Sequence, residues 1–151
     1  MSRVIASVVV PGRVSDAEDL WYDVARWPTI VDGFSHVKRR DEDWPRSGQL
    51  VWDSTPHGRG RVVERVVRYE ARVGQTAQIE EEKLLGEQTI AFETEGEGTR
   101  VTLRLEYALK QANPLSPLVD VLFIRRAQRE SLQRTLARFA RERRADHEGY
   151  D

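Results

Sequence analysis

Apolar and polar residues alternate between positions 101 and 107, and Leu109 continues the apolar set. The apolar positions are Val101, Leu103, Leu105, Tyr107 and Leu109. A period of two places these side chains on one face of a β-strand. The pattern therefore predicts a strand with one buried face and one face in contact with solvent.

A helical pattern begins after this strand and reaches about Arg144. Asn113 or Ser116 is expected to cap it, because each precedes a proline, which suits the first helical position. A helix of roughly 30 residues is about 45 Å long, enough to cross a small domain. We expect residues 145–151 to fray. An antiparallel sheet followed by one long helix indicates a sheet curled around the helix, with a space between them.

The beginning of the chain predicts one strand and two helical segments. The strand covers residues 3–10 and is closed by a proline–glycine pair. Ser15 and Glu18 fit a capping box for the next helix, which the Trp27-Pro28 pair is expected to end. A short helical turn is expected over residues 29–32.

The middle of the chain is predicted to be entirely β. The expected strands are residues 34–42, 49–54, 60–70, 76–84, 88–95 and 99–110. Turn signals between them include Gly74-Gln75 and Leu85-Gly86-Glu87. Short strands at this spacing are typical of an antiparallel meander. We therefore predict an α+β fold and a single domain over residues 1–151, with an ordered core of about 3–145.

The composition excludes several kinds of site. The 151 residues contain no cysteine, which excludes disulfides, thiolate nucleophiles and cysteine-ligated metals. His36, His57 and His147 lack metal-type spacing, and no phosphate-cradling glycine loop or nucleophile elbow occurs. We therefore expect neither a metal nor a cofactor.

The charge and hydropathy of the chain bear on its surroundings. The formal net charge is -1, so no overall field draws the chain to nucleic acid or acidic lipid. The first residues pass directly into the strand pattern, and no segment reaches the ~18 apolar residues of a membrane span. We expect a cytoplasmic protein without a membrane span, either a monomer or a homodimer.

Arginine is concentrated in the terminal helical pattern. Residues 125–144 carry eight arginines against Glu130 and Glu142. Such a stretch could bind an acidic partner. It could equally be a solvated helix face balanced by the acidic residues between positions 80 and 97. No stacking aromatics accompany the arginines, so we do not expect nucleic acid to be the partner.

Several local signatures occur in a definite order. The helix at residues 16–25 is followed by Arg26-Trp27-Pro28-Thr29-Ile30-Val31, Gly98-Thr99-Arg100-Val101-Thr102 opens the last strand, and an apolar and arginine-rich helix follows. Over about residues 3–145 this order resembles the START-like (SRPBCC) superfamily, and within it the polyketide cyclase/dehydrase branch.

The resemblance implies a helix-grip fold. An antiparallel sheet of about seven strands would wrap around the long C-terminal helix, with two short helices after the first strand. Members typically hold a deep, largely apolar cavity between sheet and helix, where they bind lipids, hormones, polyketides, aromatic compounds or quinones. Some catalyse cyclisation or dehydration, without a metal or cofactor, and many only bind and carry.

The strand over residues 61–70 offers the first candidates. One parity of the alternation gives Val63, Arg65, Val67 and Tyr69, which is the less charged set and is predicted to face the cavity. An arginine in that position must be paired or touch a ligand, because an unpaired buried charge is costly. Arg65 would orient a ligand carboxylate, enolate or phenolate, or it would form a salt bridge with a glutamate from residues 80–82.

Aromatising cyclases of the superfamily usually carry an arginine on this strand. Counting from Gly60-Arg61-Val62, the resemblance places that arginine at Tyr69. The family's arginine is therefore absent or displaced in this chain. Arg65, four residues earlier on the same predicted face, could substitute for it.

The remaining candidates are mostly apolar and would form the cavity wall or plain core. They are Trp27, Phe34, Trp52, Tyr107, Leu122 and Phe123. A buried tyrosine hydroxyl needs a partner, so that of Tyr107 is expected to meet a ligand or a backbone carbonyl.

These observations favour binding of a small hydrophobic or aromatic ligand, such as a lipid, a polyketide or a quinone-like compound, between sheet and helix. A first alternative is a polyketide cyclase or dehydratase acting on a poly-β-ketone, with Arg65 or Tyr69 as the catalytic group. A second alternative is a protein-interaction module that uses the arginine-rich helix.

Overall fold

The computed structural model describes residues 1–56, 58–110 and 117–149. The elements in chain order are β1 (Ser2–Pro11), α1 (Val14–Tyr22), the 3₁₀ helix η1 (Val24–Thr29), β2 (Phe34–Arg40), β3 (Gln49–Ser54), β4 (Arg61–Glu70), β5 (Gly74–Glu80), β6 (Leu84–Glu95), β7 (Gly98–Leu109) and α2 (Pro117–Gly149). This is the predicted α+β helix-grip fold, so that prediction is confirmed.

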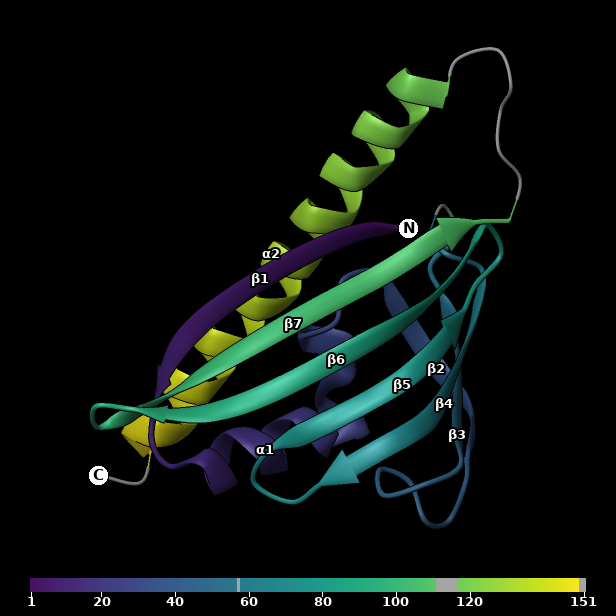
Figure 1. Ribbon diagram of the computed structural model, residues 1–151. Helices are drawn as coiled ribbons and strands as arrows, with labels where there is room; N and C mark the ends of the chain where they lie inside the picture. The colour runs from purple at the N-terminus through teal and green to yellow at the C-terminus, as the bar shows by residue number, and fades with distance from the viewer. Residues whose placement is uncertain (57, 111–116, 150–151) are drawn as a thin grey trace.

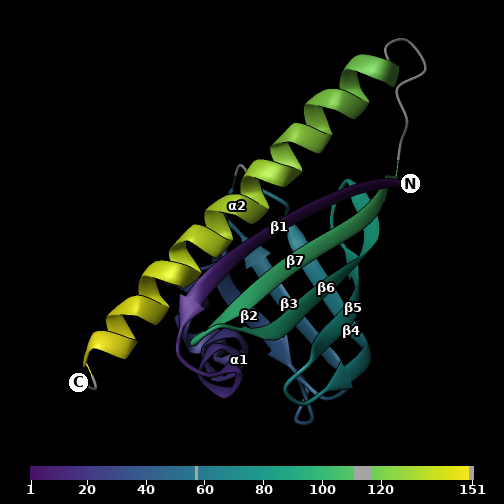
Figure 2. The same cartoon turned by 60° about the vertical axis from the view of Figure 1, so that its left-hand side comes forward.

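The described strands form one antiparallel sheet in the order β1-β7-β6-β5-β4-β3-β2. β1 pairs with β7 from Ser2 opposite Tyr107 to Pro11 opposite Gly98. The sheet curls, α2 runs along the side of β1, and α1 lies at one end of the sheet (Figure 1). After a 60° turn of the view, the first half of α2 is seen to rise past the ends of β1 and β7 (Figure 2).

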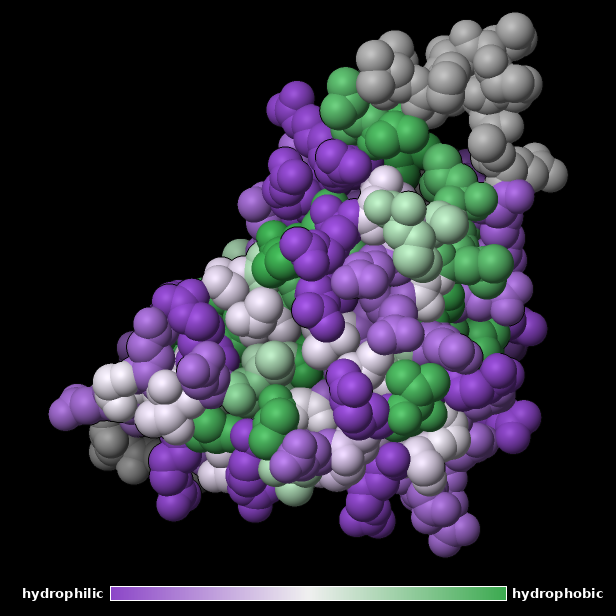
Figure 3. All heavy atoms as spheres, viewed as in Figure 1, coloured by the Kyte–Doolittle hydropathy of each residue, from purple (hydrophilic) through white to green (hydrophobic). Residues whose placement is uncertain are grey.

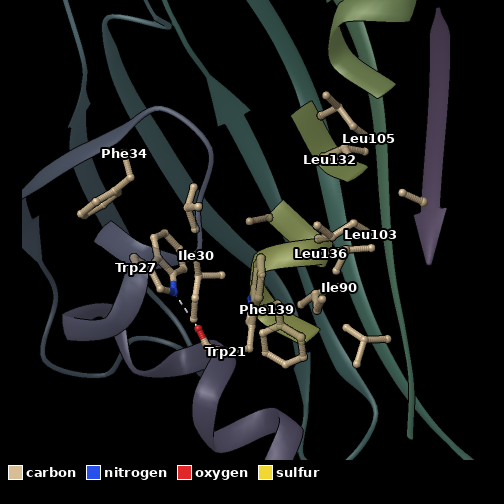
Figure 4. Packing of buried hydrophobic residues seen from close by; sticks show 14 of the residues in the cluster. Trp21, Trp27, Ile30, Phe34, Ile90, Leu103, Leu105, Leu132, Leu136 and Phe139 are labelled. Carbon is tan, nitrogen blue, oxygen red and sulfur yellow. Dashed lines mark hydrogen bonds between the residues drawn. The ribbon is translucent and has the colours of Figure 1, made fainter. Parts of the chain in front are cut away.

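The core lies between the inner face of the sheet and the second half of α2. Leu136 and Phe139 from α2 pack towards Ile90 and Leu103 of the sheet (Figure 4). Figure 4 also shows how η1 joins this core, because the indole nitrogen Nε1 of Trp27 donates a 2.7 Å hydrogen bond to the Trp21 carbonyl oxygen. The apolar stripe predicted for the second half of the helix is therefore the face that closes the fold.

The N-terminal cap of α1 differs from the prediction. Ser15 does not cap the helix, which begins at Val14 with Arg13 as its N-cap. The backbone N–H of Arg13 donates to the Asp16 carboxylate at 3.0 Å. Glu18 instead accepts a 2.6 Å hydrogen bond from the backbone N–H of Arg72, so it ties α1 to the turn between β4 and β5.

The end of the first helical segment also differs. The Trp27-Pro28 pair was expected to stop a helix, but α1 already ends at Tyr22 and the pair lies inside η1. The N–H groups of Ile30 and Val31 both donate to the Trp27 carbonyl oxygen. The helical turn predicted over residues 29–32 is therefore the end of η1 and its cap.

Two glycines predicted as turns belong to strands, Gly74 as the first residue of β5 and Gly86 within β6. A Cβ on Gly74 would stand 2.0 Å from the carbonyl oxygen of Ile90, and one on Gly86 would stand 2.2 Å from that of Glu106. These glycines permit a close approach of neighbouring strands rather than a reversal of the chain. The reversals come just before them, at Arg72 with φ 67° and at residues 81–83.

The long helix extends further than predicted at its C-terminal end. α2 continues to Gly149, so the fraying expected for residues 145–151 is wrong for residues 145–149. Arg26 donates from Nη1 to Asp146 at 2.8 Å and from Nη2 to Glu142 at 2.9 Å, which fixes this end to η1. The predicted caps Asn113 and Ser116 lie outside the described residues. Within the described ranges, no helix combines the length and apolar character that crossing a bilayer requires.

Candidate functional site

A small cavity lies between the inner face of the sheet and the second half of α2. Its wall includes Trp21, Trp52, Val62, Leu103 and Leu132. Its volume is about 20 Å³. A single water needs at least about 10–15 Å³ of such space, so the interior has room for roughly one water molecule.

Glu64 of β4 is the acidic group in the wall of this cavity. Only 5% of the residue is exposed, and the indole nitrogen Nε1 of Trp52 donates to its carboxylate at 2.6 Å. Trp52 lies on the neighbouring strand β3, and its pairing partner Val62 is two residues before Glu64. The two side chains are therefore diagonal neighbours on the inner face of the sheet.

Burial raises the pKa of Glu64 to about 7. The hydrogen bond from Trp52 and the charge of Arg59 oppose this rise, whereas the nearby carboxyl of Glu81 adds to it. A carboxyl group with this pKa exchanges its proton near neutral pH, where an ordinary glutamate is fully ionised.

Arg59, in the loop between β3 and β4, is the cation beside Glu64. Its Nε lies 3.6 Å from the carboxylate of Glu81, and its guanidinium stands over the Trp52 ring at 5.9 Å from the ring centroid. Its carbonyl oxygen accepts a hydrogen bond from the N–H of Glu82, which holds the loop against the turn after β5. Glu81 is itself buried, and burial raises its pKa despite the opposing charges of Arg59 and Lys110.

A chain of hydrogen bonds leads from Arg59 to α2 and to the segment between η1 and β2. Nη2 of Arg59 donates to the hydroxyl of Ser131 at 3.0 Å, and that hydroxyl donates to the carboxylate of Asp32 at 2.8 Å. Arg134 and Arg138 also donate to Asp32. Burial opposes ionisation of Asp32, but the hydrogen bonds from Arg134 and Ser131 and the two arginine charges outweigh it and lower its pKa.

An opening of about 200 Å³ leads from the surface to Arg59, at the end of the sheet where α2 begins. Leu84, Leu109, Phe123 and Ile124 supply its apolar lining. Because Arg59 also lines the inner cavity, its guanidinium lies between the opening and the interior. Apolar side chains gather over this end of α2 and the neighbouring sheet (Figure 3).

Tyr107 lies beside a second hollow, on the other side of Ile124. This hollow measures about 280 Å³ and is lined by Met1, Val121 and Leu109 as well. The Tyr107 hydroxyl is buried and has no hydrogen-bond partner among the described residues. The partner expected from the sequence is therefore not a backbone carbonyl of the described chain.

Four side chains of β4 were predicted to face the cavity, and this prediction is wrong for three of them. Arg65 and Val67 are exposed and Val63 is half-buried, whereas Val62 and Glu64 on the opposite face are buried. Arg65 therefore points to the outer face of the sheet. Among the described residues it forms neither the predicted contact with the cavity nor a salt bridge with residues 80–82.

The cross-strand partners explain this arrangement. Glu64 lies opposite Leu50 on β3 and Ile79 on β5, both of which are buried, and directly opposed residues share a face. Arg65 lies opposite Gln78, which is exposed. The prediction counted Glu64 as a solvent-facing charge, although its neighbours place it inside.

Tyr69 does reach the inner face. A register shift between Val66 and Arg68 interrupts the alternation of β4, so the parity of the strand changes beyond that point. The ring of Tyr69 packs against that of Tyr22, with centroids 5.8 Å apart. Tyr69 thus belongs to an aromatic cluster near α1, away from Arg59 and Glu64.

The predicted wall residues fall into two groups. Trp27, Phe34 and Trp52 are buried, and their rings form one aromatic cluster with centroid separations of 5.2 to 6.4 Å. Leu122 and Phe123 are 57% and 73% exposed. Phe123 lines the opening, whereas Leu122 lines neither the opening nor the inner cavity.

Arg59, Glu64 and Glu81 were not among the sequence candidates. Arg59 follows a Pro/Gly-rich loop that has the composition of a simple turn, and Glu81 lies in an acidic run. No signal in the sequence identified Glu64, because its face depends on the register with the strand around Trp52, which only the structure supplies.

The arginines of α2 have nearer partners than predicted. Arg134 and Arg138 contact Asp32, Arg126 contacts Glu130 at 3.1 Å, and Arg143 donates to the Pro11 carbonyl oxygen at 3.2 Å. Arg126, Arg134 and Arg138 are thus paired with Glu130 of the helix itself and with Asp32, just after η1, rather than with the acidic strands. In the part of the chain that the structure describes, no cluster of three or more acidic or histidine side chains could hold a metal ion.

A family comparison bears on this arrangement of sheet, helix and interior. The family model described as polyketide cyclase / dehydrase and lipid transport matches residues 1–143. The chain belongs to this polyketide cyclase/dehydrase family. This match confirms the resemblance to the START-like superfamily. A comparison with curated proteins found no match.

Solved structures share the fold of this family member. A protein from Thermus thermophilus is 20% identical, with 97% of this chain and 99% of that chain covered and a TM-score of 0.77. A START superfamily protein from Mycobacterium smegmatis is 15% identical over 93% and 96% of the chains, with a TM-score of 0.74. An aromatase/cyclase from Streptomyces sp. R1128 is 14% identical over 93% and 92%, with a TM-score of 0.75. At these identities the likeness concerns the fold.

Proposed function

We propose that this protein binds a small hydrophobic molecule between the sheet and α2, with access through the opening beside Arg59. The observation that carries the proposal is the apolar opening of about 200 Å³, which meets the interior at a polar cluster. Binding sites for small molecules are typically apolar with a few convergent polar groups, as here. The family description, which names both cyclase/dehydrase activity and lipid transport, supports the same class of ligand.

The size of the interior sets a condition on binding. A cavity of about 20 Å³ does not hold a drug-sized molecule, which needs roughly 300–1,000 Å³. The ligand must therefore occupy the opening and widen the interior by moving the side chains that separate the two. Arg59 is the separating side chain, and the first half of α2 carries the lining residues Phe123 and Ile124.

A substitution at the opening tests this proposal. Ala127 is exposed and lines the opening, so Ala127→Trp should fill it and weaken binding of the uncharged dye Nile red by at least about tenfold. Ala137→Trp is the matched control, because Ala137 is exposed on the same helix and does not line the opening. Equal affinity of both variants, measured by fluorescence titration, would contradict the proposed site. If Ala127→Trp weakens binding as expected, native mass spectrometry of the protein purified from its own host would identify the natural ligand.

A second candidate function is dehydration of a β-hydroxy ketone, and the pKa of about 7 at Glu64 favours it. Ionised Glu64 would take the proton from the carbon next to the carbonyl, while Arg59 stabilises the enolate oxygen. The C–O bond would then break as the enolate collapses to the enone, and protonated Glu64 would return its proton to the departing hydroxide, which leaves as water.

The Glu64→Gln variant tests this second function. It should lower the rate of enone formation from an aryl β-hydroxy ketone by at least about 100-fold, because the amide cannot act as a base. Binding of Nile red should be unchanged. An unaltered rate in the variant, followed by enone absorbance, would exclude Glu64 as the proton carrier.

A further inference from the structure

Arg59 has the contacts of a side chain that can exchange one anionic partner for another. It is 19% exposed, so the opening reaches it. Its Nε faces Glu81 and its Nη2 donates to Ser131, whereas the described residues offer its Nη1 no hydrogen-bond acceptor. The separation of 3.6 Å from the Glu81 oxygen is long for a charge-assisted hydrogen bond, which is normally about 2.7–2.9 Å.

The charged groups around Arg59 determine which ligand charge this site can bind. β4 contributes Glu64 and the turn after β5 contributes Glu81, both buried. Asp32, beyond Ser131, is already paired with Arg134 and Arg138 of α2. Lys110 after β7 pairs with Glu80 on the outer side of the same turn. Glu81 is thus the carboxylate whose place at Arg59 an incoming anion would take.

Displacement of Glu81 from Arg59 has a consequence for protons. A buried carboxylate that loses its cation is costly, and the cost disappears if the group binds a proton from solvent. Burial already raises the pKa of Glu81 and the charge of Arg59 opposes that rise, so separation from Arg59 favours protonation further. A cationic ligand in the opening would not reach the carboxyl group of Glu64, because Arg59 lies between the opening and this group, and the carboxyl group of Glu81 is already paired with Arg59.

We infer that the ligand of this site is an amphipathic anion, an apolar body with one carboxylate-, sulfonate- or enolate-like group held by Arg59, and that a proton is taken up at Glu81 as it binds. This inference rests on the proposed function. The apolar body would contact Leu84, Leu109 and Ile124. Binding would consequently strengthen as the pH falls, although the charge of the ligand itself does not change.

A matched pair of fluorescent probes tests the inference. Anilinonaphthalene sulfonate keeps its negative charge throughout the neutral range, and N-phenylnaphthylamine is the same molecule without the sulfonate. The sulfonate should bind the wild-type protein at least about tenfold more tightly than the uncharged probe, and its affinity should rise severalfold from about pH 8 to about pH 6. The affinity of the uncharged probe should not depend on pH in this way.

Single substitutions show which side chains cause the preference for the sulfonate and the pH dependence. Arg59→Met should remove the preference for the sulfonate, so that the two probes bind the variant with similar affinity. Arg61→Met is the control, because Arg61 is an exposed arginine two residues away that pairs with Asp53 on the outer face. Glu81→Gln should bind the sulfonate more tightly than wild type at about pH 8 and show a weaker pH dependence.

Proton uptake provides a readout that needs no variant. Calorimetric titration of the wild-type protein with the sulfonate, in buffers of different ionisation enthalpy, should show a net uptake of protons at about pH 7. Absence of uptake, or equal binding of the two probes with no effect of Arg59→Met, would overturn the inference and leave the proposed function standing. Failure of both probes to bind would contradict the proposed function itself.

Discussion

At the scale of single residues, Glu64 occupies a position where the strand pattern calls for an apolar side chain. It lies opposite buried Leu50 and Ile79, with Trp52 as its hydrogen-bond donor. A buried carboxyl with one neutral donor holds its proton more tightly than it would in the unfolded chain. The folded protein therefore carries a group whose protonation contributes to stability.

The stability of the protein should reflect this group. The pKa of Glu64 rises from 4.5 to about 7 on folding, so its favourable contribution is complete below about pH 4.5 and is lost as the pH rises to about 7. Glu64→Gln removes this dependence, because the amide does not titrate. We expect the variant to gain about 3 kcal/mol in unfolding free energy relative to wild type between pH 4.5 and pH 8.

Urea denaturation at several pH values measures this difference. Glu87→Gln is the control, since Glu87 is an exposed glutamate on the outer face of β6. A difference between Glu64→Gln and wild type that stays constant with pH would show that Glu64 is not protonated in the folded state at neutral pH.

The sequence was sufficient for the apolar face of β7 and the aromatic core, and insufficient for β4 and the first half of α2. Alternation identified the buried face of β7, and aromatic character identified Trp27 and Trp52 as interior. The same reasoning failed for Arg65 and Glu64. Alternation divides the residues of β4 into two faces, and the face with fewer charged residues was wrongly assigned to the interior. Only the cross-strand partners decide between them, and these depend on the register of three strands.

At the scale of elements, α2 consists of two differently supported halves. Leu132, Leu136, Phe139 and Ala140 in the second half are buried, and Arg26 and Asp32 of the η1 region bind the helix there. Between positions 121 and 130 the side chains are half-buried or exposed. The sequence predicted one long helix but not this division, because apolar residues occur in both halves.

Hydrogen exchange should reveal the division. Local opening needs less free energy where fewer side chains are buried, so amides of residues 121–130 should exchange at least about 100-fold faster than those of residues 132–143. Deuterium uptake measured by mass spectrometry on peptides from each half gives the comparison. Similar protection along the whole helix would contradict the expectation that the first half yields to a ligand.

At the scale of the whole molecule, the two ends of the curled sheet differ. α1 closes one end with the aromatic residues around Tyr22 and Tyr69, whereas the other end carries the opening beside Arg59. The order of the elements was predictable from the sequence, and so was a space between sheet and helix. The volume of that space was not, because it depends on how the rings of Trp21 and Trp52 pack.

The pairing of β1 with β7 has a consequence for the synthesis of the chain. β1 forms one edge of the sheet, and its strand partner begins at Gly98, almost ninety residues after Pro11. The first strand therefore leaves the ribosome long before the strand that will hydrogen-bond to it. Until then its apolar side chains Val4 and Val10 need another cover, such as a chaperone or a loosely collapsed intermediate. Closure of so large a loop should also make folding slow, in the range of milliseconds to seconds that is typical of sheets built from distant strands.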